Sequence, residues 1–510
     1  METTISLDEI LVLGNIPENL HGVFMRITNG LIQKAEYPKE KVLRLFAEML
    51  ANPKKFANSK NKVTNLAKEL YLLQKQGNKV ELSEEGKTYL PEEIPHFAID
   101  RKEKQKEGMF QLATASIPYK IYGAEHIEEG AVAQMETAMS LPVAVAGALM
   151  PDAHQGYGLP IGGVLATTAN TVIPYAVGVD IACRMCLSVY DLPGDFFKRQ
   201  PGLLKKALVE NTKFGMGGET AHKFDETIMD KAEWQATKII RDLKDKAYRQ
   251  LGTSGTGNHF VEWGIVEVFA EDDLLGIPKG EYLALLSHSG SRGFGGAVAN
   301  YYSQIARQKT KLPKEAAHLA WLDMNTEEGQ EYWIAMNLAG DYASANHHEI
   351  HKKIAKMIGE KPIKMVENHH NFAWKEVLAD GTEVIVHRKG ATPAGRNDLG
   401  IIPGSMTDPG FVVRGKGEAE ALNSASHGAG RLMSRKKALS SVTNSALKKA
   451  LAEKNVYLIG GDLDEAPMVY KNIEAVIASQ TELVDVLAKF TPKIVRMADA
   501  QTTRKEGRED

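Results

Sequence analysis

The two cysteines of this chain, Cys183 and Cys186, lie close to an aspartate in the segment GVDIACRM. Asp180 and Cys183 are separated by two residues, a spacing that lets a carboxylate and a thiolate converge on one or two metal ions. Taken alone, the pair favours a buried, unreactive cysteine, because a structural zinc site would need a second pair of ligands. Two cysteines are too few for a disulfide scaffold, so their interest lies in thiolate chemistry.

Histidines are concentrated in one third of the chain, where ten of the fifteen fall within residues 259–427. The apolar run at residues 282–286 leads into His288, and the run at residues 384–386 leads into His387. Both runs are typical of buried strands. Strand ends followed by glycine-containing loops are where protein scaffolds often hold reactive groups, so these segments are candidate site loops.

Most individual histidines are hydrogen-bonded or surface residues, and several positions here fit that description. His347, His348 and His351 share a polar helical pattern with Glu349 and Lys352, which predicts a solvated helix face. Four more have no chemical context: His21, His96, His222 and His318.

Three histidines have a stronger claim, because they extend the Asp180 and Cys183 pair to five potential metal ligands. They are His259 in GTGNHFVE, His288 in SHSGSR and His370 in NHHNF. A mixed set of carboxylate, thiolate and imidazole suits an open catalytic metal site better than a closed structural one.

The elements that must position these residues alternate between short apolar runs and amphipathic helices. Apolar positions predict a helix over residues 127–138 that Pro142 stops, and a longer helix over residues 228–247 that ends before Gly252. Buried strands are predicted at residues 163–168, 185–190, 282–286, 384–386 and 456–459. This mixture of predicted helices and strands indicates an α+β catalytic domain, with bounds predicted at residues 106–503.

The first part of the chain, residues 1–105, is rich in Lys, Glu and Asn and poor in Gly and His. Helices are predicted at residues 39–51 and 62–77, followed by a strand-turn pattern at residues 80–89. We interpret this part as a small accessory domain, either helical or winged-helix-like. The charged segment at residues 100–108 is the expected linker, and residues 504–510 are an expected flexible tail.

Bulk properties are those of an ordinary globular protein, with 43% hydrophobic and 25% charged residues. The acidic N-terminus does not resemble an export signal, and no apolar run approaches the length of a membrane helix, so we expect a cytoplasmic protein with no membrane partner. A formal net charge of −3 argues against a protein that coats nucleic acid over its whole surface.

Seven segments, taken in order, resemble the RtcB family of RNA ligases over about residues 117–500: PDAHQGYGLPIGGV, YAVGVDIACRM, GTGNHFVE, HSGSRGFG, HRKGATPAG, PGSM and SASHGAGRLMSR. The resemblance implies an RtcB-like catalytic domain with mixed and antiparallel sheets flanked by helices. It also implies an enzyme that uses GTP and two Mn²⁺ ions to join an RNA 3′-phosphate or 2′,3′-cyclic phosphate end to a 5′-hydroxyl end. An archease-type activator is a candidate further partner.

The same resemblance assigns roles to residues of this chain. Asp180, Cys183, His259, His288 and His370 match the metal ligands, with Cys183 suited to bridging two ions, and His427 matches the nucleophile that accepts GMP. Positions that match guanylate contacts are Asn258, His259, Phe260, Val261, Glu262, His370, Asn371, Pro403, Gly404, Ser405, Met406, His427, Gly428, Ala429, Gly430 and Lys471.

The chemistry of these residue types agrees with the implied roles. A neutral imidazole at His427 can attack the α-phosphorus of GTP once metal ions neutralise the triphosphate. Glu262 can accept hydrogen bonds from N1 and N2 of guanine, and Lys471 can donate to O6, whereas adenine lacks the 2-amino group and reverses the polarity at position 6. Gly428 and Gly430 allow phosphate to approach the backbone closely.

Two segments depart from the commoner family pattern, namely residues 407–410 after PGSM and residues 393–395 after GAT. Of the adjacent His369 and His370, the second is assigned as a ligand because Asn371 follows it. Residues 410–416 nearly spell a phosphate-binding loop, but Gly417 stands where Ser or Thr should be, so we interpret them as a turn.

Basic residues near the proposed site loops could line an RNA channel through phosphate contacts, the alternative being a solvated charged face. They are Arg292, Arg388, Lys389, Arg414, Lys416, Arg431, Arg435, Lys436 and Lys437. Two other functions stay open from the sequence: a dinuclear metal phosphoesterase acting on RNA ends or cyclic phosphates, and an inactive family member that binds RNA.

Overall fold

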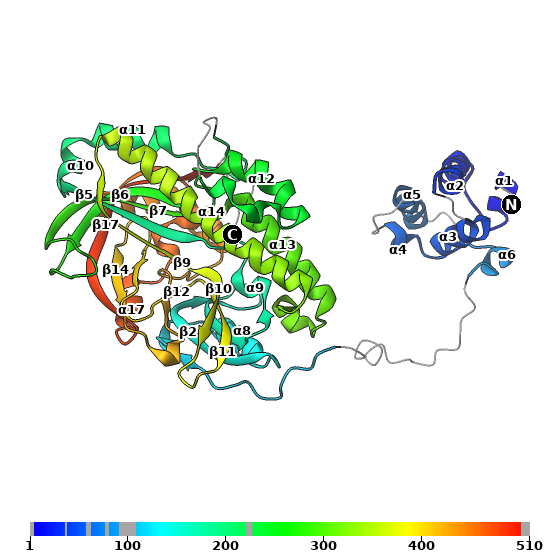
Figure 1. Ribbon diagram of the computed structural model, residues 1–510. Helices are drawn as coiled ribbons and strands as arrows, with labels where there is room; N and C mark the ends of the chain where they lie inside the picture. The colour runs from blue at the N-terminus through cyan, green and yellow to red at the C-terminus, as the bar shows by residue number, and fades with distance from the viewer. Residues whose placement is uncertain are drawn as a thin grey trace. The chain divides into compact units, whose positions relative to one another are not determined.

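The computed structural model describes residues 5–35, 38–57, 63–76, 81–90, 109–220 and 227–500. The chain forms two compact units, Met1–Glu107 and Gly108–Asp510 (Figure 1). The expected linker, the expected tail, His96 and His222 all lie outside the described residues. In the described part of the chain, none of the helices combines the length and apolar character needed to cross a bilayer.

The N-terminal unit is helical, as the sequence predicts. It contains α1 (Leu7–Leu11), α2 (His21–Ala35), α3 (Lys39–Ala51), α4 (Pro53–Ala57), α5 (Thr64–Lys75) and α6 (Glu84–Lys87). Its own core includes Phe24 and Phe46, whose rings meet edge to face at 5.0 Å. The prediction of a strand within residues 80–89 is wrong for the described residues 81–89. Leu82 forms only an isolated bridge with Gly14. Ser83 then caps α6 by accepting a hydrogen bond from Gly86 N.

The second unit confirms the α+β class. Its helices of seven or more residues are α8 (Glu129–Met139), α11 (Pro201–Asn211), α12 (Lys238–Gln250), α13 (Arg292–Lys309), α14 (Glu327–Ile358), α15 (Arg435–Ser441) and α16 (Asn444–Glu453). The single long helix predicted over residues 228–247 is wrong in its first half, which forms two 3₁₀ turns, Thr227–Asp230 and Ala232–Gln235. Trp234 explains the break, because its buried indole donates to the Ile228 carbonyl, and Thr237 then caps a new helix.

Two sheets carry most of the strands, and all five predicted strands are present. The eight-stranded sheet has the order β13 (Leu399–Ile402), β14 (Gly410–Gly415), β17 (Val484–Asp499), β6 (Phe260–Val268), β7 (Gly280–Ser289), β5 (Arg184–Pro193), β9 (Pro362–His369), with β16 (Tyr457–Gly461) paired to β17. The five-stranded sheet has the order β1 (Lys120–Ile121), β2 (Ala144–His154), β3 (Ile161–Thr168), β11 (Glu383–Lys389), β10 (Asn371–Val377). Because β14 spans residues 410–415, the turn predicted there is wrong, although the rejection of a phosphate-binding loop stands.

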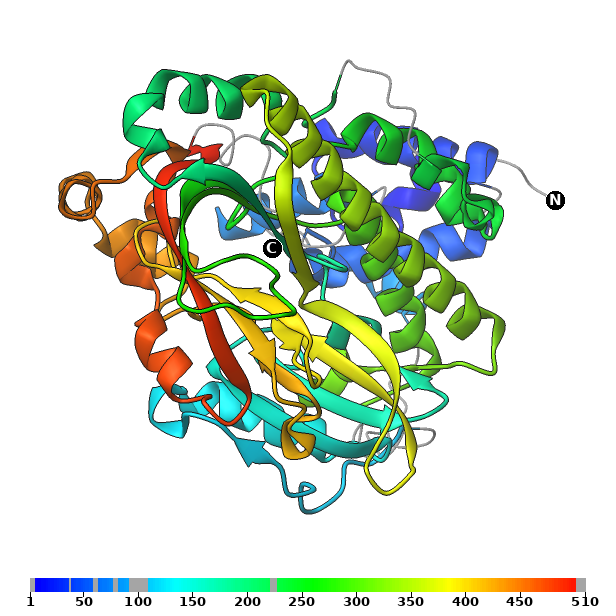
Figure 2. The same ribbon diagram turned by 60° about the vertical axis from the view of Figure 1, so that its left-hand side comes forward.

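The eight-stranded sheet curls toward a barrel, and Figure 2 shows the curvature of its long strand β17, coloured red. Its outermost strands are joined through Asn368, whose side chain donates to the Ile401 carbonyl and accepts from Ile401 N. Apolar side chains that include Met185 and Leu286 fill one face. On the other face, Leu285 packs against Ile350 of α14, the long helix that crosses the sheet (Figure 1). Alternate residues of each strand therefore face two different environments.

The two sheets are joined directly by the chain between β9 and β10. His369 ends β9 in the larger sheet and Asn371 begins β10 in the smaller one, so the chain passes between the sheets at His370. Two short pairs, β12 (Ala391–Pro393) with β15 (Ser424–Ser426) and β4 (Thr171–Val172) with β8 (Leu322–Asp323), complete the strands. His427 follows β15 directly, which brings it to the same junction.

Candidate active site

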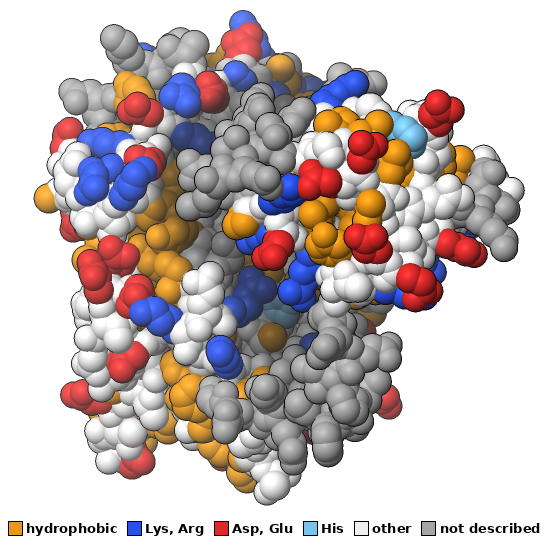
Figure 3. Space-filling view, turned by 90° about the vertical axis from the view of Figure 1, so that its right-hand side faces the viewer, with side chains coloured by type: hydrophobic (Ala, Val, Ile, Leu, Met, Phe, Trp, Pro, Cys, Tyr) orange, Lys and Arg blue, Asp and Glu red, His pale blue; other side chains and the backbone are white. Residues whose placement is uncertain are grey.

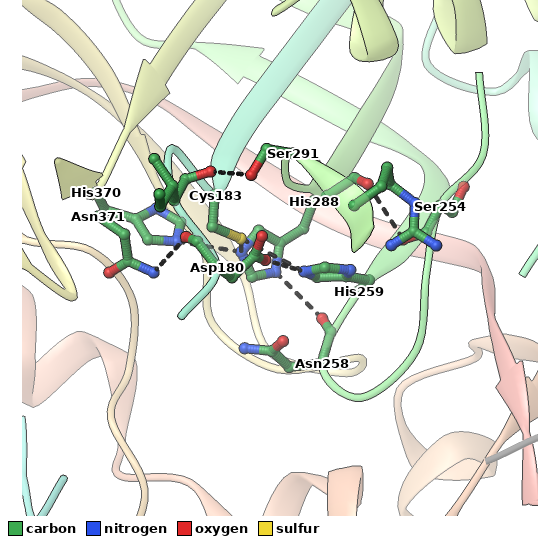
Figure 4. A network of polar contacts seen from close by, with 12 residues as sticks. Asp180, Cys183, Ser254, Asn258, His259, His288, Ser291, His370 and Asn371 are labelled. Atoms are coloured by element: carbon green, nitrogen blue, oxygen red, sulfur yellow. Dashed lines mark hydrogen bonds and ion pairs between the residues drawn. The ribbon is translucent and has the colours of Figure 1, made fainter. Parts of the chain in front are cut away.

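The five predicted metal ligands lie together at the junction of the sheets. The Nε2 atom of His259 lies 3.0 Å from Asp180 Oδ2 and 3.4 Å from Cys183 Sγ. The Nε2 atom of His288 lies 3.1 Å from the same sulfur and 3.3 Å from His370 Nε2. Figure 4 shows these side chains turned toward one another from separate strands and loops. The sulfur of Cys183 is central to the group, as a bridging ligand would be.

Backbone contacts hold this arrangement. Ala182 adopts a left-handed conformation with a φ of 57°, and its N–H donates to the Asn371 carbonyl at 2.7 Å. The Cys183 carbonyl in turn accepts from His370 N at 3.0 Å. Left-handed backbone at a non-glycine residue is strained and clusters at functional sites, and here it directly precedes Cys183.

The donor set fits divalent metal ions. His288 Nδ1 bonds the Asn258 carbonyl at 3.1 Å and must donate to it, which leaves a lone pair on the Nε2 that faces the sulfur. Burial lowers the pKa of His288 to about 3, and burial also lowers the pKa of His370 well below its ordinary value. Both imidazoles are therefore neutral at physiological pH, the form that ligates metals.

Asp180 contributes a carboxylate to the same group. Burial on its own raises the pKa of Asp180, but the neighbouring His259 outweighs this effect and the pKa lies below its ordinary value. Gly290 leaves room for the carboxylate, because a Cβ atom at that position would lie 2.1 Å from Asp180 Oδ1. The charged carboxylate can thus share an ion with the thiolate.

The predicted nucleophile His427 lies beside this cluster, with its ring centroid 4.8 Å from that of His370. Its Nδ1 lies 2.6 Å from Asp152 Oδ2, and the same oxygen accepts from the backbone N–H groups of His427 and Gly428. An ionised carboxylate accepts hydrogen bonds, so Nδ1 carries the proton and Nε2 presents its lone pair to the cavity.

Asp152 is a candidate functional residue that was not predicted from the sequence. It is fully buried, and although burial raises its pKa, His427 and Lys471 outweigh burial and hold the pKa below its ordinary value. A signal was present in the sequence, because Asp152 stands in the motif PDAHQG just after the apolar run at residues 141–150. Its partner lies 275 residues further along the chain, so spacing could not connect them.

Lys471 lies behind Asp152. Its ammonium donates to the carbonyls of Pro151 and Ala153, at 3.1 and 2.7 Å, on either side of the aspartate. Lys471 is not among the residues that line the adjoining cavity, so the structure gives it a role in holding Asp152. Its contact with guanine stays a prediction.

A cavity of about 560 Å³ opens in front of the metal cluster and His427. Most of the predicted guanylate-contacting positions line it: Asn258, Phe260, Glu262, His370, Asn371, Pro403, Gly404, Ser405, Met406, His427, Gly428, Ala429 and Gly430. Val261 and His259 are not among the lining residues; Val261 packs in the core on the outer face of the sheet. Burial raises the pKa of Glu262 well above its ordinary value.

The segment at residues 407–410, which departs from the family pattern, also reaches this cavity. Asp408 lines it and accepts a hydrogen bond from Ser405 Oγ at 2.5 Å. Gly404 is tightly enclosed, because a Cβ atom there would lie 2.4 Å from the Pro409 carbonyl oxygen. The altered residues thus shape the wall that carries the predicted contacts Pro403 to Met406.

Two of the basic residues that we predicted to line an RNA channel are instead buried in the protein. Arg292 is buried and donates to Thr253 Oγ1 and the Gly215 carbonyl. Arg388 is buried in an ion pair with Glu376 at 2.6 Å. Lys389, Arg431 and Arg435 line the cavity, while Lys436 and Lys437 are exposed on α15. Among the described side chains drawn in Figure 3, acidic and basic groups are interspersed.

The solvated face predicted for the histidines of α14 is wrong for two of them. His347 and His351 are buried against the sheet, and burial lowers the pKa of His351 to about 3. His348 is half exposed and lies 3.5 Å from Glu367, as a surface histidine would. His387 is also structural, because the Ile173 N–H donates to its Nε2. A helical pattern shows which residues share a face but not what covers it.

Comparison with known sequences then decides the family. A sequence profile described as "tRNA-splicing ligase RtcB" matches residues 134–247 and 226–498. The chain belongs to the RtcB family. The RNA-splicing ligase RtcB of Escherichia coli K12 is 34% identical over 67% of this chain and 87% of its own length. The tRNA-splicing ligases RtcB of Thermococcus kodakarensis and Nanoarchaeum equitans are each 30% identical, over 68% and 74% of this chain and 86% and 95% of their own lengths. The RtcB resemblance read from the seven motifs is confirmed.

Proposed function

We propose that this chain is an RNA ligase that uses GTP and two Mn²⁺ ions to join an RNA 3′-phosphate or 2′,3′-cyclic phosphate end to a 5′-hydroxyl end. Membership of the RtcB family supports the RNA ligase class. The observation that carries the finer proposal is the position of His427: a histidine with one nitrogen fixed by Asp152 and the other facing a cavity beside a carboxylate, thiolate and imidazole cluster.

In the first step, His427 Nε2 attacks the α-phosphorus of GTP, and the bond to the bridging oxygen of pyrophosphate breaks. The product is a phosphoramidate between His427 and GMP. Asp152 stabilises the positive charge that develops on the imidazole, because its carboxylate lies 2.6 Å from Nδ1. Manganese held by Asp180, Cys183, His259, His288 and His370 would supply the positive charge that neutralises the triphosphate.

A 2′,3′-cyclic phosphate end is first opened by water, which breaks the P–O2′ bond and leaves a 3′-phosphate. In the second step, an oxygen of the RNA 3′-phosphate attacks the phosphorus of GMP, and the P–N bond to His427 breaks. The RNA then ends in a diphosphate linked to guanosine. In the third step, the 5′-hydroxyl of the other strand attacks the former 3′-phosphate, loses its proton and expels GMP. Lys389, Arg431 and Arg435 line the cavity where the phosphates would lie. Both arginines are ion-paired with Glu465, so a phosphate would share their donors with that carboxylate.

Guanine selection would rest on Glu262. The side chain is buried at the cavity wall, where burial raises its pKa. Guanine offers two N–H donors, at N1 and N2, and these favour the ionised carboxylate, so binding is expected to lower the pKa of Glu262 again. Adenine lacks both donors at these positions and would leave a buried carboxyl group without partners.

The test is covalent labelling. Wild-type protein incubated with α-labelled GTP and Mn²⁺ is expected to retain label after denaturation, and the label should be released by acid, as a phosphoramidate is. His427→Ala should abolish labelling. His348→Ala, which removes a half-exposed histidine from α14, is the matched control and should label normally. Label on His427→Ala would overturn the assignment of the nucleophile. Turnover of RNA ends without GTP would favour the metal phosphoesterase instead.

A further inference from the structure

A second group of potential metal ligands lies on the outer face of the eight-stranded sheet. Cys186 of β5 pairs in register with Ser287 of β7, and their side chains face α14. The helix supplies His347 and His351, which are one turn apart and share a face. The thiol and imidazole donor atoms all lie within 4.8 Å of one another.

This group is closed to solvent and separate from the catalytic cluster. Cys186 and His347 have no exposed surface, and His351 is 2% exposed. None of the three lines the cavity. Ser287 and His288 are neighbours on β7, and successive strand residues point to opposite faces, so the sheet separates the two groups.

Hydrogen bonds orient the imidazoles as ligands. His347 Nε2 bonds the Ser289 carbonyl at 3.1 Å and must donate to it, which leaves the lone pair on Nδ1 facing inward. His351 Nδ1 lies 2.7 Å from Ser188 Oγ, and its Nε2 faces the centre of the group. Both inner nitrogens converge on one atom, Ser287 Oγ, at 2.6 and 2.7 Å.

We propose that Cys186, His347 and His351 bind a structural zinc ion, with Ser287 Oγ as the fourth ligand. One thiolate and two neutral imidazoles in a closed, buried site are a ligand set that zinc prefers. Tetrahedral zinc holds such donors roughly 3 to 4 Å apart. The thiol and imidazole donor atoms here lie within 4.8 Å of one another, so small movements would bring them to a shared ion.

Binding requires two proton movements. The Cys186 thiol releases its proton to solvent as the S–Zn bond forms. The single hydroxyl hydrogen of Ser287 is donated to His347 Nδ1, so His351 carries its proton on Nε2 before the ion binds. That proton is transferred to Nδ1, which then donates to Ser188 Oγ, and Nε2 becomes the ligand. Rotation of the Ser287 side chain admits the ion between the two nitrogens and keeps the oxygen within reach.

Zinc binding is expected to make the backbone around the proposed catalytic ligands more rigid. β5 also follows directly from Cys183, and β7 carries His288, so an ion that ties both strands to α14 would fix the backbone from which two catalytic ligands project. The zinc site goes beyond the proposed ligase function and does not depend on it.

The test uses the fact that Cys183 and Cys186 are the only cysteines. Full-length Cys183→Ser protein, expressed in medium where cobalt replaces zinc, has a single thiol. It is expected to show a near-ultraviolet sulfur-to-cobalt charge-transfer band together with visible bands of tetrahedral cobalt. The double variant Cys183→Ser/Cys186→Ser is the control and should lack the charge-transfer band, although histidines of the catalytic cluster remain.

A second measurement covers the case in which the double variant fails to fold. Zinc content of Cys183→Ser, produced with zinc, should be about one tightly held ion per chain after dialysis against a weak chelator, and His351→Gln in the same background should lose it. Glutamine retains an amide that can bond Ser287. A folded Cys183→Ser protein without the charge-transfer band and without zinc would overturn the proposal and leave a hydrogen-bonded polar cluster.

Discussion

At the scale of single residues, the site depends on one hydrogen bond that fixes a tautomer. Asp152 accepts from His427 Nδ1 and so leaves Nε2 with its lone pair, the atom that we propose as the nucleophile. Lys471 holds the carbonyls on either side of Asp152, so the aspartate cannot turn away. The proposed attacking atom is therefore selected by two residues, Asp152 and Lys471, that do not line the cavity.

Asp152→Asn is expected to lower the rate of GMP labelling by roughly 10²- to 10⁴-fold, because an amide in that place no longer stabilises the charged imidazole or fixes its tautomer. Rapid-quench measurement of labelling at saturating GTP tests this. Asp191→Asn, which changes an exposed aspartate of β5, should label at the wild-type rate. Wild-type labelling by Asp152→Asn would show that the hydrogen bond is dispensable.

Lys389 gives a prediction about pH. Burial lowers its pKa from 10.5 to about 7, so between these values the unfolded chain holds a proton that the folded protein has lost. Stability contributed by this residue therefore rises as the pH rises through that window. Lys389→Met should be more stable than wild type near about pH 6, and this advantage should shrink by about 2 kcal/mol near about pH 9.

Denaturant unfolding of the two proteins at several pH values measures the effect. Lys375→Met removes an exposed ammonium from the neighbouring strand β10 and controls for the loss of a lysine in general. A difference in the free energy of unfolding between wild type and Lys389→Met that stays constant with pH would contradict the prediction.

At the scale of elements, the proposed metal ligands occupy strand ends and the turns that join strands. The turn after β7 is the tightest example, because Gly290 leaves space that Asp180 occupies. The backbone of Gly290 is not left-handed, so alanine is excluded there by the carboxylate alone. The shape of a turn thus sets the position of a ligand on another segment.

Gly290→Ala should weaken manganese binding by roughly 10- to 100-fold without altering a ligand, because the added methyl group displaces the Asp180 carboxylate. Labelling measured as a function of Mn²⁺ concentration tests this. Gly296→Ala in α13 is the matched control, since its Cβ atom would meet only Val179 Cγ1, at 3.9 Å. Equal manganese dependence in the two variants would count against this account.

At the scale of the whole molecule, two units with separate hydrophobic cores should fold independently. The N-terminal core around Phe24 and Phe46 shares no residue with the core clusters of the second unit. The metal cluster, His427 and the cavity belong entirely to residues 108–510.

A protein of residues 108–510 should therefore keep GMP labelling to within roughly threefold of the full chain. Calorimetry of the full chain should show a transition that is absent from the shorter protein. Loss of labelling together with retained circular dichroism would instead assign the N-terminal unit a part in catalysis, and RNA joining assays would then locate it.

Much of the fold could be predicted from the sequence, because the patterns that indicate helices and strands lie within short stretches of the chain. Apolar runs predicted strands such as β7, and helical periodicity with Pro142 predicted α8. Local patterns failed where a distant side chain intervenes, as Trp234 does in breaking the helix predicted from residue 228. They also could not reveal that Arg388 is buried in an ion pair rather than facing RNA.

The sequence by itself determined the ligand types, their order and the family, since these reside in short motifs whose chemistry is carried by residue identity. Only the tertiary structure decided that Asp152 meets His427, and that His347 and His351 face Cys186 instead of water. The physical reason is that periodicity records which side chains share a face, whereas packing between segments far apart in the chain decides whether that face meets solvent, a core or another polar group.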